Sequence, residues 1–502
     1  MKCVFPLAAL SLCLVGCGGS SSKNTTIPEQ PTSALLQQLE ADRVANNAGA
    51  ISLAIYHKGD VVYTGAVGKP QVGKALPIND ETLFQIGSTT KVLTSIAALQ
   101  LIQNQTVNFD DTLTNSLANI NYPNDKSAFW QSIQLDWLMT HQGGFEDSYA
   151  GIQNDSSLIA YMTDEFTTNN ELMNKPGQFF NYSNPNYSYL GAVISSQSDM
   201  EYATYVEQEV LQKLGMTRST FSNAQVKADG NYALSIMDNG FKVTDINQLE
   251  DPEVVLPAGG NTWSTPTEML KLAAFILKGD EAVLNANLHK KITQKHAKIP
   301  GPIEAHYGYG MMILDGIAHN NQWYPIRHYQ HGGNANAFTS MFYVFPEQDL
   351  AISILSSGEG DDLSDSLIAA LEHVDLLPTP KPLELPSANT QFYDKFAGQY
   401  IADGVSFYIT HAEQKLMLNI PALDNANIAY SDVIEPIAAN TFVITIDDEQ
   451  MAFTFVSTDD NHSFDYLVNR QLVATRLLTE AQNQSPALTD WLEKLKVNKI
   501  NL

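Results

Sequence analysis

Residues 87–102 read Gly-Ser-Thr-Thr-Lys-Val-Leu-Thr-Ser-Ile-Ala-Ala-Leu-Gln-Leu-Ile, a serine and a lysine three positions apart at the head of an apolar run. The run predicts a helix. Positions i and i+3 of a helix lie on one face, so the hydroxyl of Ser88 can meet the amine of Lys91. The positive end of the helix favours an alkoxide and helps to keep the lysine neutral. A serine beside a neutral amine is an activated nucleophile.

Two further elements follow this pair in order along the chain. They are Tyr182-Ser183-Asn184, in a polar loop before a helical pattern, and His331-Gly332-Gly333, before a predicted strand hairpin. Taken singly, the three elements are better interpreted as a helix N-cap, a turn and a glycine bulge. The Ser-x-x-Lys spacing also occurs at Ser20-x-x-Lys23, in a Ser/Gly stretch. Their occurrence together, each with suitable flanks, favours a catalytic site.

The second and third elements each have a similar sequence elsewhere. Tyr122-Pro123-Asn124 is not closely followed by a helical pattern, and His141-Gln142-Gly143 precedes the tyrosine motif instead of following it. The order of the motifs therefore selects Tyr182 and His331.

The trio Ser88-x-x-Lys91, Tyr182-x-Asn184 and His331-Gly332-Gly333 resembles that of class C β-lactamases and their relatives, the D-aminopeptidases, D-alanyl-D-alanine carboxypeptidases and family VIII esterases. The resemblance runs from about Leu35 to about Ser357 and implies an antiparallel sheet flanked by helices, with the active site between the sheet and an all-helical region. The third motif departs from the many β-lactamases that have Lys-Thr-Gly there. Flanking segments that also resemble the family are Leu138-Met139-Thr140-His141-Gln142-Gly143-Gly144, Leu214-Gly215-Met216-Thr217, Pro257-Ala258-Gly259-Gly260 and Tyr307-Gly308-Tyr309-Gly310.

Each motif residue has an expected role. Ser88 Oγ attacks a carbonyl carbon and forms an acyl-enzyme, with Lys91 as the base if its surroundings lower its pKa. Tyr182 exchanges protons with Lys91 and protonates the leaving group. Asn184 positions the substrate amide or the lysine by hydrogen bonding.

The third motif and its neighbours are expected to form the substrate-binding side of the site. The resemblance implies that the backbone N–H groups of Ser88 and Asn334 form the oxyanion hole. Gly332 and Gly333 leave room for substrate against the strand. His331 faces the substrate or the lysine-tyrosine pair, and a neutral histidine holds a carboxylate less firmly than a lysine would. Arg327 is the candidate for the missing cation.

The net charge argues against one class of partner, and the N-terminal sequence indicates the cellular compartment. The chain has 502 residues and a net charge of −27, which argues against nucleic acid as a partner. All three cysteines lie within the first 17 residues, where a positive start and a short apolar run describe a secretory signal. Leu-Val-Gly before Cys17 resembles a lipoprotein box. We therefore expect lipidation at Cys17, membrane contact through that anchor alone, and a place in a bacterial envelope, at the outer membrane facing the periplasm.

The pattern of elements predicts an α/β domain with a helical insertion, followed by an all-β barrel or sandwich. In the first domain we expect a helix at Leu35–Ala45, a hairpin at 51–63, mostly helices over 110–300, strands at Ala337–Phe345 and Leu350–Leu355, and a closing helix at Asp365–Val374. Six short strands are expected after the prolines. The expected segments are 1–17 signal and lipobox, 18–34 linker, 35–377 hydrolase domain, 378–390 Pro-rich linker, 391–480 barrel-like domain and 481–502 helical tail.

Other chemistries have no motif in this chain. It lacks Gly-x-Ser-x-Gly, His-Glu-x-x-His, a Cys/His cluster and a glycine-rich phosphate loop. We expect neither a metal nor a cofactor. The leading hypothesis is a serine hydrolase that cleaves an ester or amide in a small-molecule or peptide substrate, of D-amino-acid peptide, ester or β-lactam type. The alternatives are a penicillin-binding sensor that is acylated with little turnover and an envelope binding protein with a vestigial site.

Overall fold

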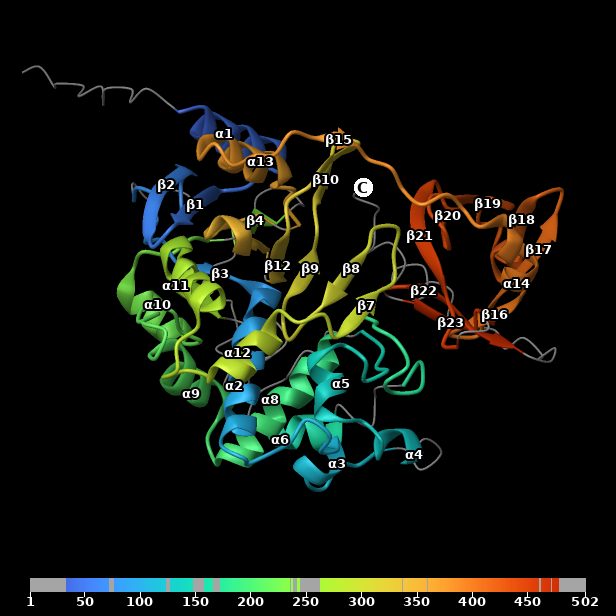
Figure 1. The fold of residues 1–502 in the computed structure, drawn as a ribbon, viewed down its shortest axis with the longest axis horizontal. Coiled ribbons are helices and arrows are strands. Elements are labelled where there is room, and N and C mark those ends of the chain that lie inside the picture. The colour runs from blue at the N-terminus through green and yellow to red at the C-terminus, as the bar shows by residue number, and fades with distance from the viewer. Residues whose placement is uncertain are drawn as a thin grey trace, which may run out of the picture.

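The computed structural model describes residues 33–71, 76–122, 127–147, 158–165, 172–234, 236–237, 242–243, 262–335, 337–358, 360–459, 462–470 and 472–477. The expected signal with Cys17, the Pro257–Gly260 segment and the expected tail helix lie outside these ranges. Within them the chain forms an α/β domain and a β-barrel to one side of it (Figure 1). The expected fold class is confirmed, and the second domain is a closed barrel.

An eight-stranded antiparallel sheet organises the first domain, in the order β2-β1-β14-β13-β12-β9-β8-β7. Its central strands alternate apolar side chains between two faces, as a sheet covered on both sides requires. In β1, for example, Ile51, Leu53 and Ile55 belong to one core cluster and Ala50 and Ala54 to the other. The strands are β1 Ala50–His57, β2 Asp60–Gly68, β7 Ala297–Ile299, β8 Ala305–Tyr307, β9 Met312–Leu314, β12 His328–Ala335, β13 Phe338–Phe345 and β14 Leu350–Ser356.

Helices cover both faces of this sheet (Figure 1). The first and last helices of the domain, α1 Ala34–Ala45 and α13 Ser364–His373, pack on one face. Ser33 caps α1 by accepting a hydrogen bond from Leu36 N, so this helix begins inside the segment expected to be linker. The other face packs against α11 Pro266–Lys278, and α2 Thr90–Gln103 and α8 Asn184–Ser198 belong to the same core cluster.

The sequence pattern gives no residue range for four strands of this sheet. Strands β7, β8 and β9 have three residues each, too short for an alternating pattern to register. Strand β12 contains His331-Gly332-Gly333-Asn334, which has low strand propensity. It forms because β13 pairs with it from Tyr329 to Ala335 and β9 pairs with its first residues, His328–Gln330. The strand is thus internal to the sheet, and its motif residues pair on the β13 side.

The chain leaves the first domain through a proline-rich segment that is not a free linker. Lys381–Pro382 forms β15 beside β11 Gln322–Tyr324. The barrel then closes β23 onto β16, around a core that includes Phe407, Phe442 and Phe455. Its strands are β16 Gly398–Ala402, β17 Val405–Ala412, β18 Lys415–Asn419, β19 Val433–Pro436, β20 Thr441–Ile446, β21 Glu449–Val456, β22 Tyr466–Asn469 and β23 Leu472–Leu477.

None of the helices in the described ranges has both the length and the apolar character needed to span a lipid bilayer.

Candidate active site

Ser88 lies in a tight turn just before the predicted helix. The turn is a 3-10 helix over Gly87–Thr89, and α2 itself begins at Thr90. Gly87 adopts φ +50°, a conformation that glycine accepts without strain. The Thr89 hydroxyl lies 2.8 Å from Ser340 Oγ on β13, which ties the turn to the sheet. The nucleophile therefore stands at the junction of the sheet and the helical region.

Lys91 is fully buried on the first turn of α2. Its Nζ lies 2.9 Å from Ser88 Oγ and 2.8 Å from Asn184 Oδ1. Burial lowers the pKa of Lys91 well below its ordinary value, and the charge of Arg470 lowers it further while that of Asp147 raises it. A neutral Nζ can donate to Asn184 and accept the proton of Ser88, so the geometry suits a general base.

Tyr182 lies over Lys91, with Nζ 4.8 Å from the ring centroid. His141 stacks behind the Tyr182 ring at 4.2 Å between centroids. His141 precedes the tyrosine motif and is therefore not the third motif, yet the structure places it in the site through Tyr182. It is fully buried and its pKa is lowered well below the ordinary value, first by burial and then by Lys91. A neutral imidazole therefore supports the phenol from behind.

The structure fixes the tautomer of His331. Its Nδ1 lies 2.6 Å from the Gly332 carbonyl oxygen, so Nδ1–H donates there. Its Nε2 lies 3.2 Å from the Tyr307 hydroxyl, which therefore donates to it. Burial, and then the charge of Lys91, lowers the pKa of His331 to about 3. A histidine locked and neutral in this way supplies no charge to a substrate carboxylate.

The glycines of the third motif differ in their surroundings. Gly333 passes so close to the nucleophile turn that a Cβ there would stand 2.0 Å from Ile86 O and 2.8 Å from Ser88 N. A Cβ on Gly332 would meet only Ser340 O, at 3.6 Å. Gly333 thus lets β12 touch the turn, whereas Gly332 borders open space. The contact brings the Asn334 segment against Gly87, beside the backbone N–H of Ser88.

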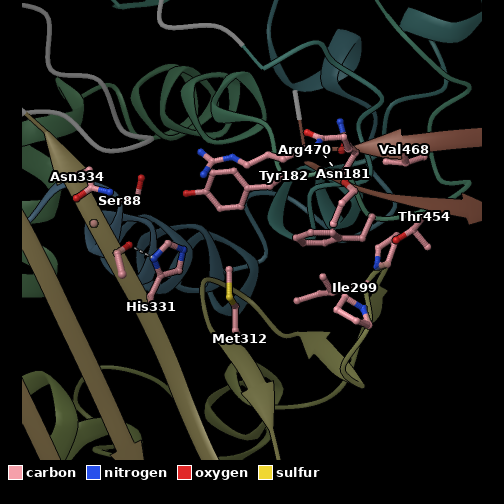
Figure 2. A pocket seen from close by; sticks show the side chains of 18 of the residues that line it. Ser88, Asn181, Tyr182, Ile299, Met312, His331, Asn334, Thr454, Val468 and Arg470 are labelled. Carbon is pink, nitrogen blue, oxygen red and sulfur yellow. Dashed lines mark hydrogen bonds between the residues drawn. The ribbon is translucent and has the colours of Figure 1, made fainter. Parts of the chain in front are cut away.

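A cavity of about 510 Å³ opens in front of Ser88. One wall is β12, where His331 and Asn334 flank the serine, and Tyr182 points across the space (Figure 2). The far wall belongs to the barrel, so the site lies between the two domains. Barrel residues that line the cavity are Thr441, Ala452, Thr454, Val468, Asn469 and Arg470.

Arg470 takes the place that the sequence analysis gave to Arg327. Arg327 pairs with Asp315 at 2.6 Å on the surface and does not line the cavity; that expectation was wrong. Among the described lining residues, the guanidinium of Arg470 is the only arginine or lysine head group. It lies 4.3 Å from the centroid of the Tyr182 ring and 3.4 Å from Asp147 Oδ2 (Figure 2 shows it beside Tyr182).

The structure brings Ser88, Lys91, Tyr182, Asn184 and the His331–Asn334 strand into one site. Sequence reasoning missed Arg470 and Asp147, because each lies in a loop with no motif of its own. Tyr307 was quoted only as part of a flanking segment. In the described ranges, no group of three or more His, Cys, Asp or Glu side chains is arranged to hold a metal ion.

Comparison with known proteins finds relatives of this chain. Penicillin-binding protein 4* of Bacillus subtilis is 21% identical over 385 residues, covering 72% of this chain and 82% of its own. Protein flp of Staphylococcus aureus is 24% identical over 334 residues, 64% of this chain and 61% of flp.

Solved structures show the same fold. SurE matches with a TM-score of 0.66 and 19% identity, over 88% of this chain and 98% of its own. The octameric penicillin-binding protein homologue from Pyrococcus abyssi matches with a TM-score of 0.59 and 22% identity, over 88% and 99%. D-amino acid amidase from Ochrobactrum anthropi SV3 matches with a TM-score of 0.55 and 20% identity, over 68% of this chain and 98% of the amidase chain. The family model described as Beta-lactamase matches residues 36–374, and the chain therefore belongs to the Beta-lactamase family of serine hydrolases.

Proposed function

We propose that this protein hydrolyses amide or ester bonds in small derivatives of D-amino acids, through an acyl-enzyme on Ser88. The observation that carries the proposal is the buried Lys91 Nζ, 2.9 Å from Ser88 Oγ and held by Asn184. Burial keeps this amine able to accept a proton near neutral pH. An activated serine at the floor of a cavity is suited to acyl transfer.

The reaction has two halves. Ser88 Oγ attacks the substrate carbonyl carbon while its proton passes to Lys91 Nζ, and the N–H groups of Ser88 and Asn334 receive the oxyanion. The C–N or C–O bond then breaks, and the leaving group takes a proton through the Tyr182 hydroxyl. Water next attacks the acyl ester, which releases the acid and returns the proton to Ser88.

The lining of the cavity supports a small substrate with an apolar group. Apolar side chains of both domains line it, among them Phe180, Ile299, Met312 and Val468. Arg470 brings a positive charge to the same space. Solved relatives include SurE with D-Leu and a D-amino acid amidase, which favours D-configured substrates for this chain.

A substrate panel tests the proposal. Purified protein is assayed with D- and L-alanyl p-nitroanilides, p-nitrophenyl esters and nitrocefin, beside Ser88→Ala and Lys91→Met. We expect turnover that prefers the D-amide, and a loss of about 10³-fold or more in both variants. Full turnover by Ser88→Ala would exclude the serine as nucleophile, and equal rates on D- and L-amides would exclude the stereochemical preference.

A second candidate is acylation by β-lactams without turnover, which the likeness to a penicillin-binding protein favours. Intact-mass measurement after mixing with benzylpenicillin separates the two. A lasting adduct on Ser88, with no hydrolysis of the D-amide, would favour the sensor function over the hydrolase.

We also propose that Cys17 is lipidated and anchors the protein to the envelope, on the basis of Leu14-Val15-Gly16-Cys17 after an apolar run. Palmitate labelling of cells expressing the full chain tests this. Wild type is expected to carry label and Cys17→Ala to carry none; an unlabelled wild type would contradict the anchor.

A further inference from the structure

Asp147 is a buried carboxylate with three neighbours at the edge of the site. Its side chain is 1% exposed. Oδ1 accepts hydrogen bonds from the backbone N of Asn184, at 2.8 Å, and from Asn184 Nδ2, at 3.0 Å. Oδ2 lies 3.4 Å from Arg470 Nη2 of the barrel. A carboxylate is thus shared between the N-terminus of α8 and the second domain.

The orientation of Asn184 depends on this carboxylate. The amide can present either its oxygen or its NH2 group to Lys91, whose Nζ is 2.8 Å away. An ionised carboxylate only accepts hydrogen bonds, so Asp147 selects the rotamer whose NH2 faces Asp147. The amide oxygen then faces Lys91. The opposite rotamer would set NH2 against the amine and oxygen against oxygen.

These contacts form a continuous path from the barrel to the nucleophile. It runs from Arg470 to Asp147, to Asn184, to Lys91 and to Ser88, and each step is a contact of 3.4 Å or less. We propose that Asp147 is a positioning residue that sets Asn184 for the catalytic lysine, and that Arg470 is its counter-ion, so that the docked barrel completes the catalytic base. This inference rests on the proposed acyl transfer at Ser88.

The charges explain why the barrel must contribute a cation. A buried carboxylate near Lys91 favours the ammonium form, which cannot accept the proton of Ser88, and the pKa of Lys91 is raised by Asp147 accordingly. Arg470 opposes that effect and lowers the pKa of Lys91. Asp147 can therefore position Asn184 by hydrogen bonding, while the positive charge of Arg470 offsets its tendency to keep Lys91 protonated.

Other polar groups face Lys91 and do not replace this pair. His141 and His331 are buried, and burial and Lys91 keep the pKa of each well below neutrality. The rings of Tyr182 and Tyr187 lie 4.8 and 5.7 Å from Nζ, and burial raises the pKa of Tyr187 above its ordinary value. The two histidines and Tyr187 are therefore uncharged at working pH, and Asp147 and Arg470 supply the charges that set the proton balance of the lysine.

The test is the pH dependence of kcat for a p-nitrophenyl ester in Asp147→Asn, Arg470→Gln and the double variant. Activity needs neutral Lys91, so the acid limb of the profile follows the pKa of the lysine. Removing the negative charge is expected to move this limb to lower pH, and removing the positive charge to move it to higher pH. The double variant is expected to return toward wild type. Asp147→Ala also loses the hydrogen bonds, and we expect kcat to fall about tenfold to a hundredfold with KM little changed.

The controls separate charge from structure. Lys415→Gln removes a barrel charge from an exposed position outside the cavity and is expected to leave the profile unchanged. Arg470→Lys is expected to restore the wild-type limb. The Arg470 side chain is about two-fifths exposed, so we expect its variants to fold. They allow the test to be completed where an Asp147 variant does not fold.

The outcomes distinguish the inference from the function beneath it. The inference would be overturned if the acid limb stayed in place, or moved in the same direction in Asp147→Asn and Arg470→Gln. A Ser88-dependent activity of the wild type would still leave the proposed function intact. Absence of Ser88-dependent activity in the wild type would overturn both.

Discussion

Replacing Gly333 with alanine tests whether contact between β12 and the nucleophile turn builds the site. The new Cβ would stand 2.0 Å from the Ile86 carbonyl oxygen, 2.7 Å from Ser340 Oγ and 2.8 Å from Ser88 N. Two of these three atoms are backbone, and Cβ contacts below 3.0 Å essentially never occur. The strand or the turn must therefore move by about 1 Å, in the segment that carries Ser88.

The magnitude follows from that displacement. Overpacking of a close-packed interior costs about 1–3 kcal/mol, so thermal unfolding of Gly333→Ala is expected at a lower temperature. A misplacement of about 1 Å at a reacting group costs about a hundredfold in rate. Activity should thus fall much more than folding does, because the displaced atoms include the nucleophile turn itself.

The assay pairs this variant with Gly332→Ala. A Cβ on Gly332 lies in ordinary contact with Ser340 O at 3.6 Å, so we expect a melting temperature equal to or slightly above wild type. Labelling of Ser88 by a fluorophosphonate reports the nucleophile without relying on one substrate. Labelling and kcat/KM of Gly333→Ala close to wild type would refute the reasoning, as would equal losses in both alanine variants.

Three further predictions concern single residues. Tyr307→Phe leaves His331 Nε2 without its 3.2 Å donor, and chemical denaturation should show a loss of about 1–3 kcal/mol; an unchanged midpoint would contradict this. Burial raises the pKa of Asp361 from 3.8 to about 6, so its contribution to stability is present below pH 3.8 and lost as pH rises through about 6. At 1.36 kcal/mol per pH unit, the free energy of unfolding of Asp361→Asn should rise relative to wild type by up to about 3 kcal/mol between pH 4 and pH 7.5. A difference that does not change with pH would refute the assignment. Phe455→Ala removes a buried ring stacked 4.4 Å from Phe396 in the barrel and should cost about 3–5 kcal/mol by thermal unfolding, whereas a wild-type melt would show that the barrel core is not cooperative.

The sequence carries the fold class and the catalytic motifs because both are local patterns. Ser88 and Lys91 share a helical turn, and their 2.9 Å contact follows from spacing alone. The outer strands of the sheet, β7 to β9, have no such signal at three residues each. They form because an edge of the sheet is available to pair with them, which is a property of the assembled domain.

The parts of the site that the sequence did not reveal depend on contacts between distant segments. His141 looks like a misplaced third motif until the structure stacks its ring on Tyr182. Arg470 directly follows the barrel strand β22, and no pattern within the barrel indicates which of its loops faces Ser88. Arg327 lies four residues before His331 and is closer to it along the chain than Arg470 is, but its ion pair with Asp315 holds it at the surface. Nearness along the chain was the wrong guide because the cavity lies between two domains.

The third motif and the barrel are connected through charge. Where a lysine stands at this position, the strand itself brings a cation to the site. Here His331 is locked between the Gly332 carbonyl and Tyr307 and stays neutral, with its pKa near 3. The cation among the described lining residues is instead Arg470, attached to the other domain. A cation on the barrel acts on Ser88 chemistry only while the barrel is docked, so with a neutral histidine on the strand the second domain is part of the active site.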